Sequence, residues 1–416
     1  MKHLPFHSLY LLPLCLFYVM SCDDVAEKKI FPQEYRLTGM RYPLGGGDVK
    51  DMEIKDGFLI LCMNYSPIRI FSTEDYSFIQ SFEERQPSEP SKINQFVKTS
   101  SPFLYIMNVN NKNEIRKYQV DSLGQPVLLQ SGFTGVTNSM HRAYMLHDSL
   151  ILYDEFIPDA SLKIHNLHTN STEHVLPYGT TSLEDRFLDK NMGGVYANDS
   201  CIAFVYKYQD RIDFFDWQFN LKQSVNHQKS DPVIYKHEWG AGLPPQNVLY
   251  YGNSFMGQNY FYTLYRGVSN QLFRSDSILV NRDFNIYVYG LTRDVLEVYD
   301  LQGHPLCRFH FDDLAPSMFV VDEDKNRLLG HRIAYGDSLL VYPLQGLPKN
   351  GGMHPKSAQL PYRSSLPTIP EPESPQAYLS NYAIFNPFDV APTYFVYMDG
   401  IGIYFPTVEA YPHKQR

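Results

Sequence analysis

The feature that most constrains this chain is a repeat of short apolar runs. In most repeats, an aromatic residue or a histidine lies 13–15 residues after the first residue of the run. A polar turn follows shortly after this ring. The aligned ring positions are Phe71, Tyr118, His165, Phe215, Tyr299 and Tyr342, at intervals of 47, 47, 50, 84 and 43 residues. A degenerate strand repeat of about 45 residues is typical of a β-propeller, in which each repeat forms one blade.

The apolar runs are predicted to be strands. They are rich in β-branched and aromatic residues, are too short for helices, and follow residues that favour tight turns. The runs cover residues 58–61, 103–107, 150–153, 202–206 and 327–329. With a third strand that carries the ring and a last strand such as 78–82 or 306–311, each repeat makes a four-stranded meander. The chain is therefore predicted to be all-β, a six-bladed β-propeller of four-stranded antiparallel blades.

The long interval between Phe215 and Tyr299 leaves the blade count open. It is close to twice the period, so it can hold a seventh blade. It can also hold a long insertion in the fifth blade. In that interpretation residues 259–265 form the second strand, residues 266–284 form a loop, and residues 286–289 form the next strand.

The first 22 residues resemble a bacterial lipoprotein signal. Lys2 precedes an apolar stretch at 9–20 that has the length of a secretory signal and is too short to span a bilayer. The sequence Val19-Met20-Ser21-Cys22 resembles the lipoprotein cleavage site, which predicts acylation of Cys22 and a lipid anchor in the membrane. An ordinary signal peptide with an incidental cysteine is the alternative. The acidic residues after Cys22 resemble the surface-export signal of Bacteroidetes lipoproteins, so we expect the outer membrane, on its periplasmic or surface face.

Net charge and cysteine content argue against some classes of function. A net charge of −9 argues against nucleic acid as a partner. Beyond the leader and Cys22, only Cys62, Cys201 and Cys307 remain, far apart and without metal-ligand spacing, so we expect buried thiols. The run that starts at Asp322 lacks the glycine and glutamate of a calcium loop. No catalytic residue, metal or cofactor is predicted.

Segments in the second half resemble the TolB-like six-bladed propeller lipoproteins of Bacteroidetes. Tyr262-Thr263-Leu264-Tyr265-Arg266-Gly267 precedes a polar insertion, and residues 296–306 (LEVYDLQGHPL) and 318–328 (MFVVDEDKNRL) continue the pattern. These segments are similar to the LYxG, VFDxxGxP and FxVDExxxxLY segments of that family. The resemblance covers roughly residues 40–344 and implies six blades with an insertion in the fifth. The chain departs from the family at residues 83–90, where an expected glycine-containing turn has no glycine.

These patterns predict five segments along the chain. They are a signal peptide at 1–21, a tether at 22–33, the propeller at 34–344, a Pro-rich linker at 345–377 and an aromatic C-terminal extension at 378–416. The extension is expected to contain a hairpin around Asp399-Gly400. Residues 34–40 are expected to join the sixth blade and close the ring.

The loops that lead into the first strand of each propeller blade gather on one face, which is the usual binding face. Polar residues expected to be uncommitted in or near these loops are Asn94, His141, Arg142, Asn191, Asn247 and Arg266. Such groups suit a glycan or a peptide. We therefore expect a non-catalytic binding or interaction module for a glycan, peptide or protein partner. A propeller hydrolase or lyase with a site at the channel entrance and a structural module of an envelope assembly are the alternatives.

Overall fold

The computed structural model describes most of the chain between Phe31 and Leu347. The described residues are 31–45, 49–63, 67–83, 94–108, 113–136, 140, 142–147, 149–155, 161–178, 191, 193–226, 246–269, 278–281, 286–288, 294–312, 315–332, 338–347, 395–398 and 401–404. The described residues form strands and turns, and they contain no helix that could cross a membrane. The predicted signal peptide, the lipidation residue Cys22 and the Pro-rich segment from 348 onward lie outside this range.

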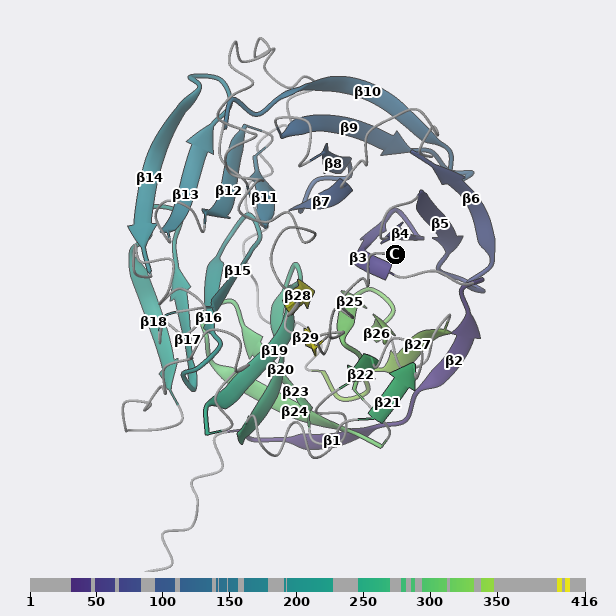
Figure 1. Cartoon of the computed structure of the whole chain (residues 1–416), viewed down its shortest axis with the longest axis vertical. Helices are drawn as coiled ribbons and strands as arrows, with labels where there is room; N and C mark the ends of the chain where they lie inside the picture. Colours follow the sequence, from purple (N-terminus) through teal and green to yellow (C-terminus); the bar gives the residue numbers. More distant parts are fainter. Residues whose placement is uncertain are drawn as a thin grey trace, which may run out of the picture.

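The fold is all-β and consists of four-stranded antiparallel sheets arranged as a β-propeller (Figure 1). Two sheets are simple meanders in chain order. The first contains β3 (Val49–Lys55), β4 (Phe58–Met63), β5 (Ile68–Ser72) and β6 (Phe78–Phe82). The second contains β15 (Gly193–Ala197), β16 (Ile202–Tyr206), β17 (Arg211–Phe215) and β18 (Leu221–Asn226).

Two further meanders are joined into one eight-stranded sheet. One contains β7 (Asn94–Thr99), β8 (Leu104–Asn108), β9 (Glu114–Val120) and β10 (Pro126–Phe133). The other contains β11 (Ala143–Leu146), β12 (Leu150–Glu155), β13 (Ser161–Asn166) and β14 (Ser171–Pro177). The link is a parallel pair between the two first strands, β7 and β11.

The long interval in the repeat is an insertion within one sheet. That sheet contains β19 (Val248–Met256), β20 (Tyr260–Ser269), β23 (Val295–Asp300) and β24 (Pro305–Phe311). Since β20 pairs directly with β23, the residues between them add no blade. The insertion contains a hairpin of β21 (Ile278–Asn281) and β22 (Ile286–Val288), so part of the predicted loop is a strand. The last group contains β25 (Met318–Asp322), β26 (Arg327–His331) and β27 (Ser338–Pro343).

The N-terminal segment closes the ring, but differently from the prediction. β1 (Glu34–Leu37) pairs in parallel with β24, so it adds an outer strand to the fifth group rather than joining the last one. The following strand, β2 (Met40–Pro43), pairs with β27 and completes the last group. Between them the chain passes so close to Tyr342 that a Cβ on Gly39 would lie 2.4 Å from the Tyr342 ring. The segment therefore crosses from one sheet to the next at a position that requires glycine.

The repeated rings occupy equivalent positions on the third strand of each group. All are at most 7% exposed, which confirms that the repeat marks buried positions. In five groups the pairing between third and fourth strands shifts register immediately before the ring, at Phe71, Tyr118, His165, Phe215 and Tyr299. A bulge of this kind bends the strand and increases its twist. The outer strand thus curves at the same place in each of these groups.

The first strand of each group lies innermost in the ring (Figure 1). Apolar cores fill the space between neighbouring sheets: one joins Met52 and Phe71 of the first sheet to Val320 and Val341 of the last. The predicted C-terminal hairpin is confirmed as β28 (Phe395–Met398) paired with β29 (Ile401–Tyr404). β29 lies next to β22, so the C-terminal hairpin contacts the hairpin of the insertion.

Candidate functional site

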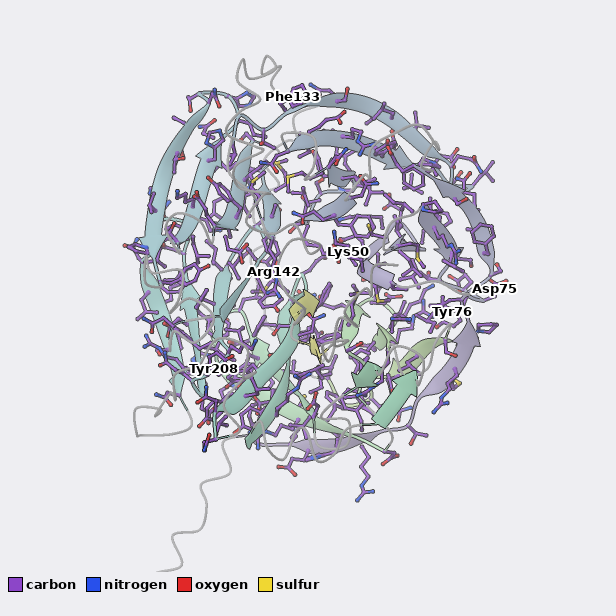
Figure 2. The ribbon with its side chains drawn as sticks, viewed as in Figure 1. Lys50, Asp75, Tyr76, Phe133, Arg142 and Tyr208 are labelled. Atoms are coloured by element: carbon purple, nitrogen blue, oxygen red, sulfur yellow. The ribbon has the colours of Figure 1, made fainter. Side chains whose placement is uncertain are left out.

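Within the described residues, the half-buried charged and amide side chains of the inner strands lie on β3 and β7, and Arg142 directly precedes the adjoining inner strand β11. We call them the axial polar group: the half-buried residues Lys50, Asp51, Gln95, Lys98 and Arg142. Lys50 and Asp51 belong to β3, Gln95 and Lys98 to β7, and Arg142 directly precedes β11. Figure 2 shows Lys50 and Arg142 extending into the middle of the ring from these two sides. This group offers positive charge near the ring axis of an acidic protein.

Lys98 is fixed by carboxylates on the neighbouring sheet. Its Nζ lies 2.7 Å from Asp51 and 3.0 Å from Glu53. Burial by itself lowers the pKa of Lys98, but the two carboxylates outweigh burial and raise the pKa above its ordinary value. Lys98 therefore stays charged and holds β3 against β7, so we assign it a structural role.

Lys50 and Arg142 are the cations of the group that are better suited to a ligand. Lys50 Nζ donates to the backbone oxygen of Asn94 at 3.0 Å and has no carboxylate partner within the described part of the chain. The Arg142 guanidinium lies 4.9 Å from the ring centre of Tyr196, a cation–π contact. A Cβ on Gly194 would lie 2.0 Å from Arg142 Nη1, so this glycine makes room for the guanidinium. Both side chains thus extend toward the ring axis.

Two residues expected to be uncommitted are buried and paired instead. Asn94 is 8% exposed and accepts a hydrogen bond from Arg116 Nη2 at 2.9 Å. Arg266 is 7% exposed and forms an ion pair with Asp294 at 2.9 Å. Burial raises the pKa of Asp294, although Arg266 opposes that shift. Neither side chain is an open binding group, because each joins segments of its own sheet.

The remaining predicted residues do not converge on one point. Asn247 is buried just before β19, and Asn191 accepts a hydrogen bond from Gln209 at 3.1 Å. His141 and Cys22 lie outside the described residues. Among the predicted residues that the structure describes, Arg142 lies next to the strand β11, which pairs with β7, and Figure 2 shows it near the middle of the ring, as it does Lys50 of β3.

A second repeat signal, two residues before each ring, accompanies the first. This position is charged in five of the six repeats and holds Arg69, Arg116, Lys163, Asp213 and Glu297. Four of these pair with an opposite charge in the interior: Arg116 with Glu83, Lys163 with Glu155, Asp213 with Arg211 and Glu297 with Arg308. Alignment of the repeats on their rings would have shown this signal. The paired charges stabilise the sheets and are not available to a ligand.

The interior thiols are unreactive. Cys62, Cys201 and Cys307 are free and buried, as predicted, and burial raises the pKa of each to about 12. Within the described residues no three His, Cys, Asp or Glu side chains lie close enough together to hold a metal ion. The chemistry that the described part of the site offers is therefore charge and hydrogen bonding from Lys50, Gln95 and Arg142.

Comparison of the sequence with protein-family models and with curated proteins finds no match.

Proposed function

We propose that this chain is a lipid-anchored β-propeller of the cell envelope that acts as a non-catalytic binding module. Its partner is a glycan, a peptide or a protein. A count of six blades is supported by the six groups of strands, in which the eight-stranded sheet holds two and β2 completes the last. The sequence resemblance to TolB-like propeller lipoproteins of Bacteroidetes supports an outer-membrane location, with Cys22 as the acylated residue.

The observation that carries the binding function is the axial polar group. Lys50 donates to the backbone oxygen of Asn94, and the Arg142 guanidinium lies over the Tyr196 ring, so both bring positive charge toward the middle of the ring. A guanidinium and an ammonium near one axis suit a ligand with carboxylate or other anionic oxygens. We therefore favour acidic glycans or acidic peptides over neutral ones.

Array binding tests the proposed function. Purified protein is applied to glycan and peptide arrays, and binders are measured again with the variants Lys50→Ala and Arg142→Ala. Both variants should weaken binding at least about tenfold, which corresponds to the loss of one charge-assisted contact. Ser131→Ala, on the exposed outer strand β10, is the matched control and should bind normally. Binding that Arg142→Ala leaves unchanged would place the ligand elsewhere.

A structural role in an envelope assembly is the second candidate, because one outer strand carries an uncharged surface. Leu128 and Leu129 of β10 are 51% and 44% exposed, Val127 is 49% exposed, and Leu123 of the preceding turn is 73% exposed. Edge strands are usually protected by charge. Cross-linking in intact cells with a photoreactive residue at Leu128 would separate this role from the first. Capture of one defined protein would favour assembly, and no capture would favour ligand binding.

A further inference from the structure

The first described residues of the chain are fixed to the ring. Phe31 is 1% exposed, its ring centre lies 5.4 Å from that of Tyr299, and the Arg308 guanidinium lies 4.4 Å from it. Arg308 N donates to the backbone oxygen of Gln33 at 2.9 Å. Residues 31–33, which the sequence analysis assigned to the tether, are therefore part of the propeller.

The attachment continues along one edge of the molecule. β1 pairs with β24 over four residues, Leu37 is 1% exposed, and Asp312 N donates to Leu37 O at 3.0 Å. Figure 1 shows β1 along the outer rim of the ring, on the side opposite β10. The first described residues therefore lie at the β1–β24 rim.

The segment between the proposed anchor and this rim is short. Eight residues lie between Cys22 and Phe31, and the nine residue-to-residue steps from one to the other span at most about 32 Å when the chain is fully extended. A compact unit of about 310 residues has a radius of gyration near 20 Å and is about 50 Å across. The tether is thus too short to let the ring turn its far side to the bilayer.

The charges on this rim do not oppose contact with a membrane surface. Arg36 lies 3.6 Å from Asp312, and His310 lies 3.4 Å from Glu34, so acidic and basic groups alternate there. Arg36 has 85% of its side chain exposed.

We infer that the β1–β24 rim lies nearer the bilayer than the opposite rim, which carries β10. This inference rests on the proposed acylation of Cys22. It implies that β10 is the part of the ring farthest from the membrane surface.

Energy transfer to labelled lipids tests this orientation. The acylated full-length protein is reconstituted in vesicles of phosphatidylethanolamine and phosphatidylglycerol with a headgroup-labelled acceptor lipid. A donor dye is attached at Arg36→Cys or at Ser131→Cys, both exposed positions. The native thiols do not compete, because burial raises their pKa to about 12. Transfer from position 36 should be about twofold or more higher, since the two positions differ in height by much of the ring's width.

A longer tether provides the control. Twenty flexible residues inserted between Glu27 and Lys28 should bring the two transfer efficiencies close together, because the ring can then turn freely. Equal transfer from both positions with the natural tether would overturn the orientation, as would a difference that persists with the long tether. Mass spectrometry of the same sample reports the acyl chain separately. Protein without it would overturn the anchor and the orientation together, whereas acylated protein with equal transfer would overturn the orientation alone.

Discussion

At the scale of single residues, His165 is the exception among the six repeated rings. The other five positions hold Phe or Tyr, and His165 occupies the same buried place on β13 with 5% of its surface exposed. Its Nε2 atom makes no hydrogen bond within the described part of the chain. A polar ring atom that is buried without a partner destabilises the folded state, because its hydration is lost and not replaced.

We predict that His165→Phe reduces the sensitivity of the protein to acid. At neutral pH the gain from removing the buried Nε2 atom is offset by the loss of the hydrogen bonds between the ring and Asn170 and Thr134. Burial lowers the pKa of His165 below its ordinary value of 6.5. Below pH 6.5 the unfolded chain therefore binds a proton that the folded chain does not. The free energy of unfolding therefore falls as the pH drops from 6.5 toward the pKa that His165 has in the folded chain. At pH 5.5 this loss amounts to up to about 1 kcal/mol.

Urea unfolding at pH 7.5 and 5.5 checks this prediction. The loss of stability between the two values should be smaller for His165→Phe than for the natural chain. His168→Gln, at an exposed position, is the control for the replacement of a histidine as such. An equal loss for His165→Phe would mean that His165 does not titrate differently in the two states.

The buried charge pairs next to the rings give a second prediction at this scale. Glu297 is fully buried, accepts from Tyr299 Oη at 2.6 Å and pairs with Arg308 at 2.5 Å. Glu297→Gln leaves the Arg308 cation without its counter-charge, so we expect a loss of about 3 kcal/mol in the free energy of unfolding. Glu74→Gln, at an exposed pair with Lys325, should leave the melting temperature unchanged. If both variants melt like the natural chain, the interior pairs contribute nothing to stability.

The candidate site shows how far binding residues can be predicted from the sequence. Nothing in the sequence distinguishes Arg142 from Asn94 or Arg266, because all three are polar and close to the same type of loop. What separates them is burial by distant partners: Arg116 bonds Asn94, and Asp294 pairs with Arg266. These contacts depend on how strands pair in space. The accessible Lys50 was missed because it lies within β3 and not in a loop.

At the scale of elements, the turn between the third and fourth strands recurs with an aspartate at its start. Asp121, Asp216 and Asp300 each accept two backbone N–H groups of the turn that follows. Such turns fix the hairpin locally. In the fifth group the turn also carries Gly303 with φ +87°, and its Cα faces Phe214 of the preceding sheet. The turn thus contacts the neighbouring blade as well as closing its own hairpin.

We predict that Gly303→Ala destabilises the protein by roughly 2–4 kcal/mol, as the sum of backbone strain and overpacking. A Cβ there would lie 2.7 Å from Phe214 Cδ2, so it cannot be accommodated without movement of the ring. Gly45→Ala is the matched control. Gly45 also has positive φ, at +71°, but a Cβ there meets nothing within 4 Å. Thermal unfolding should show only the backbone cost of about 1–2 kcal/mol for Gly45→Ala. If both variants lose the same amount of stability, contact with Phe214 adds nothing to the cost of Gly303→Ala.

Strands that are marked by residues adjacent in the sequence could be predicted. Pairings between strands that are far apart in the sequence could not. The strand predicted at 78–82 is β6, and the run at 202–206 is β16, because turn residues and apolar runs are adjacent in the sequence. Residues 34–40 also read as a strand. The strand that pairs with Glu34–Leu37 could not be predicted, however, because β24 is distant in the sequence and the pairing is parallel.

At the scale of the whole molecule, the ring is held closed by its N-terminal segment. β2 supplies the outer strand of the group that β25, β26 and β27 begin. β1 adds to the group before it, and Tyr35 Oη donates to Gly346 O at 3.2 Å, near the other end of the ring. Thr38 between the two strands donates to Asp312 at 2.5 Å. The two ends of the propeller thus meet on one rim, where the same segment contacts two neighbouring sheets.

Successive N-terminal truncations should therefore lower stability in two steps. A chain that begins at Phe31 keeps both strands and should unfold at the temperature of the longer chain. A chain that begins at Thr38 loses Phe31, Leu37 and β1, and burial of two such side chains is worth about 3–6 kcal/mol. A chain that begins at Val49 also loses β2, so the last sheet has an open edge and the ring is not closed. Calorimetry should show a lower melting temperature for the second chain and no single cooperative transition for the third. If the third chain melts cooperatively at the natural temperature, contacts between the other sheets alone close the ring.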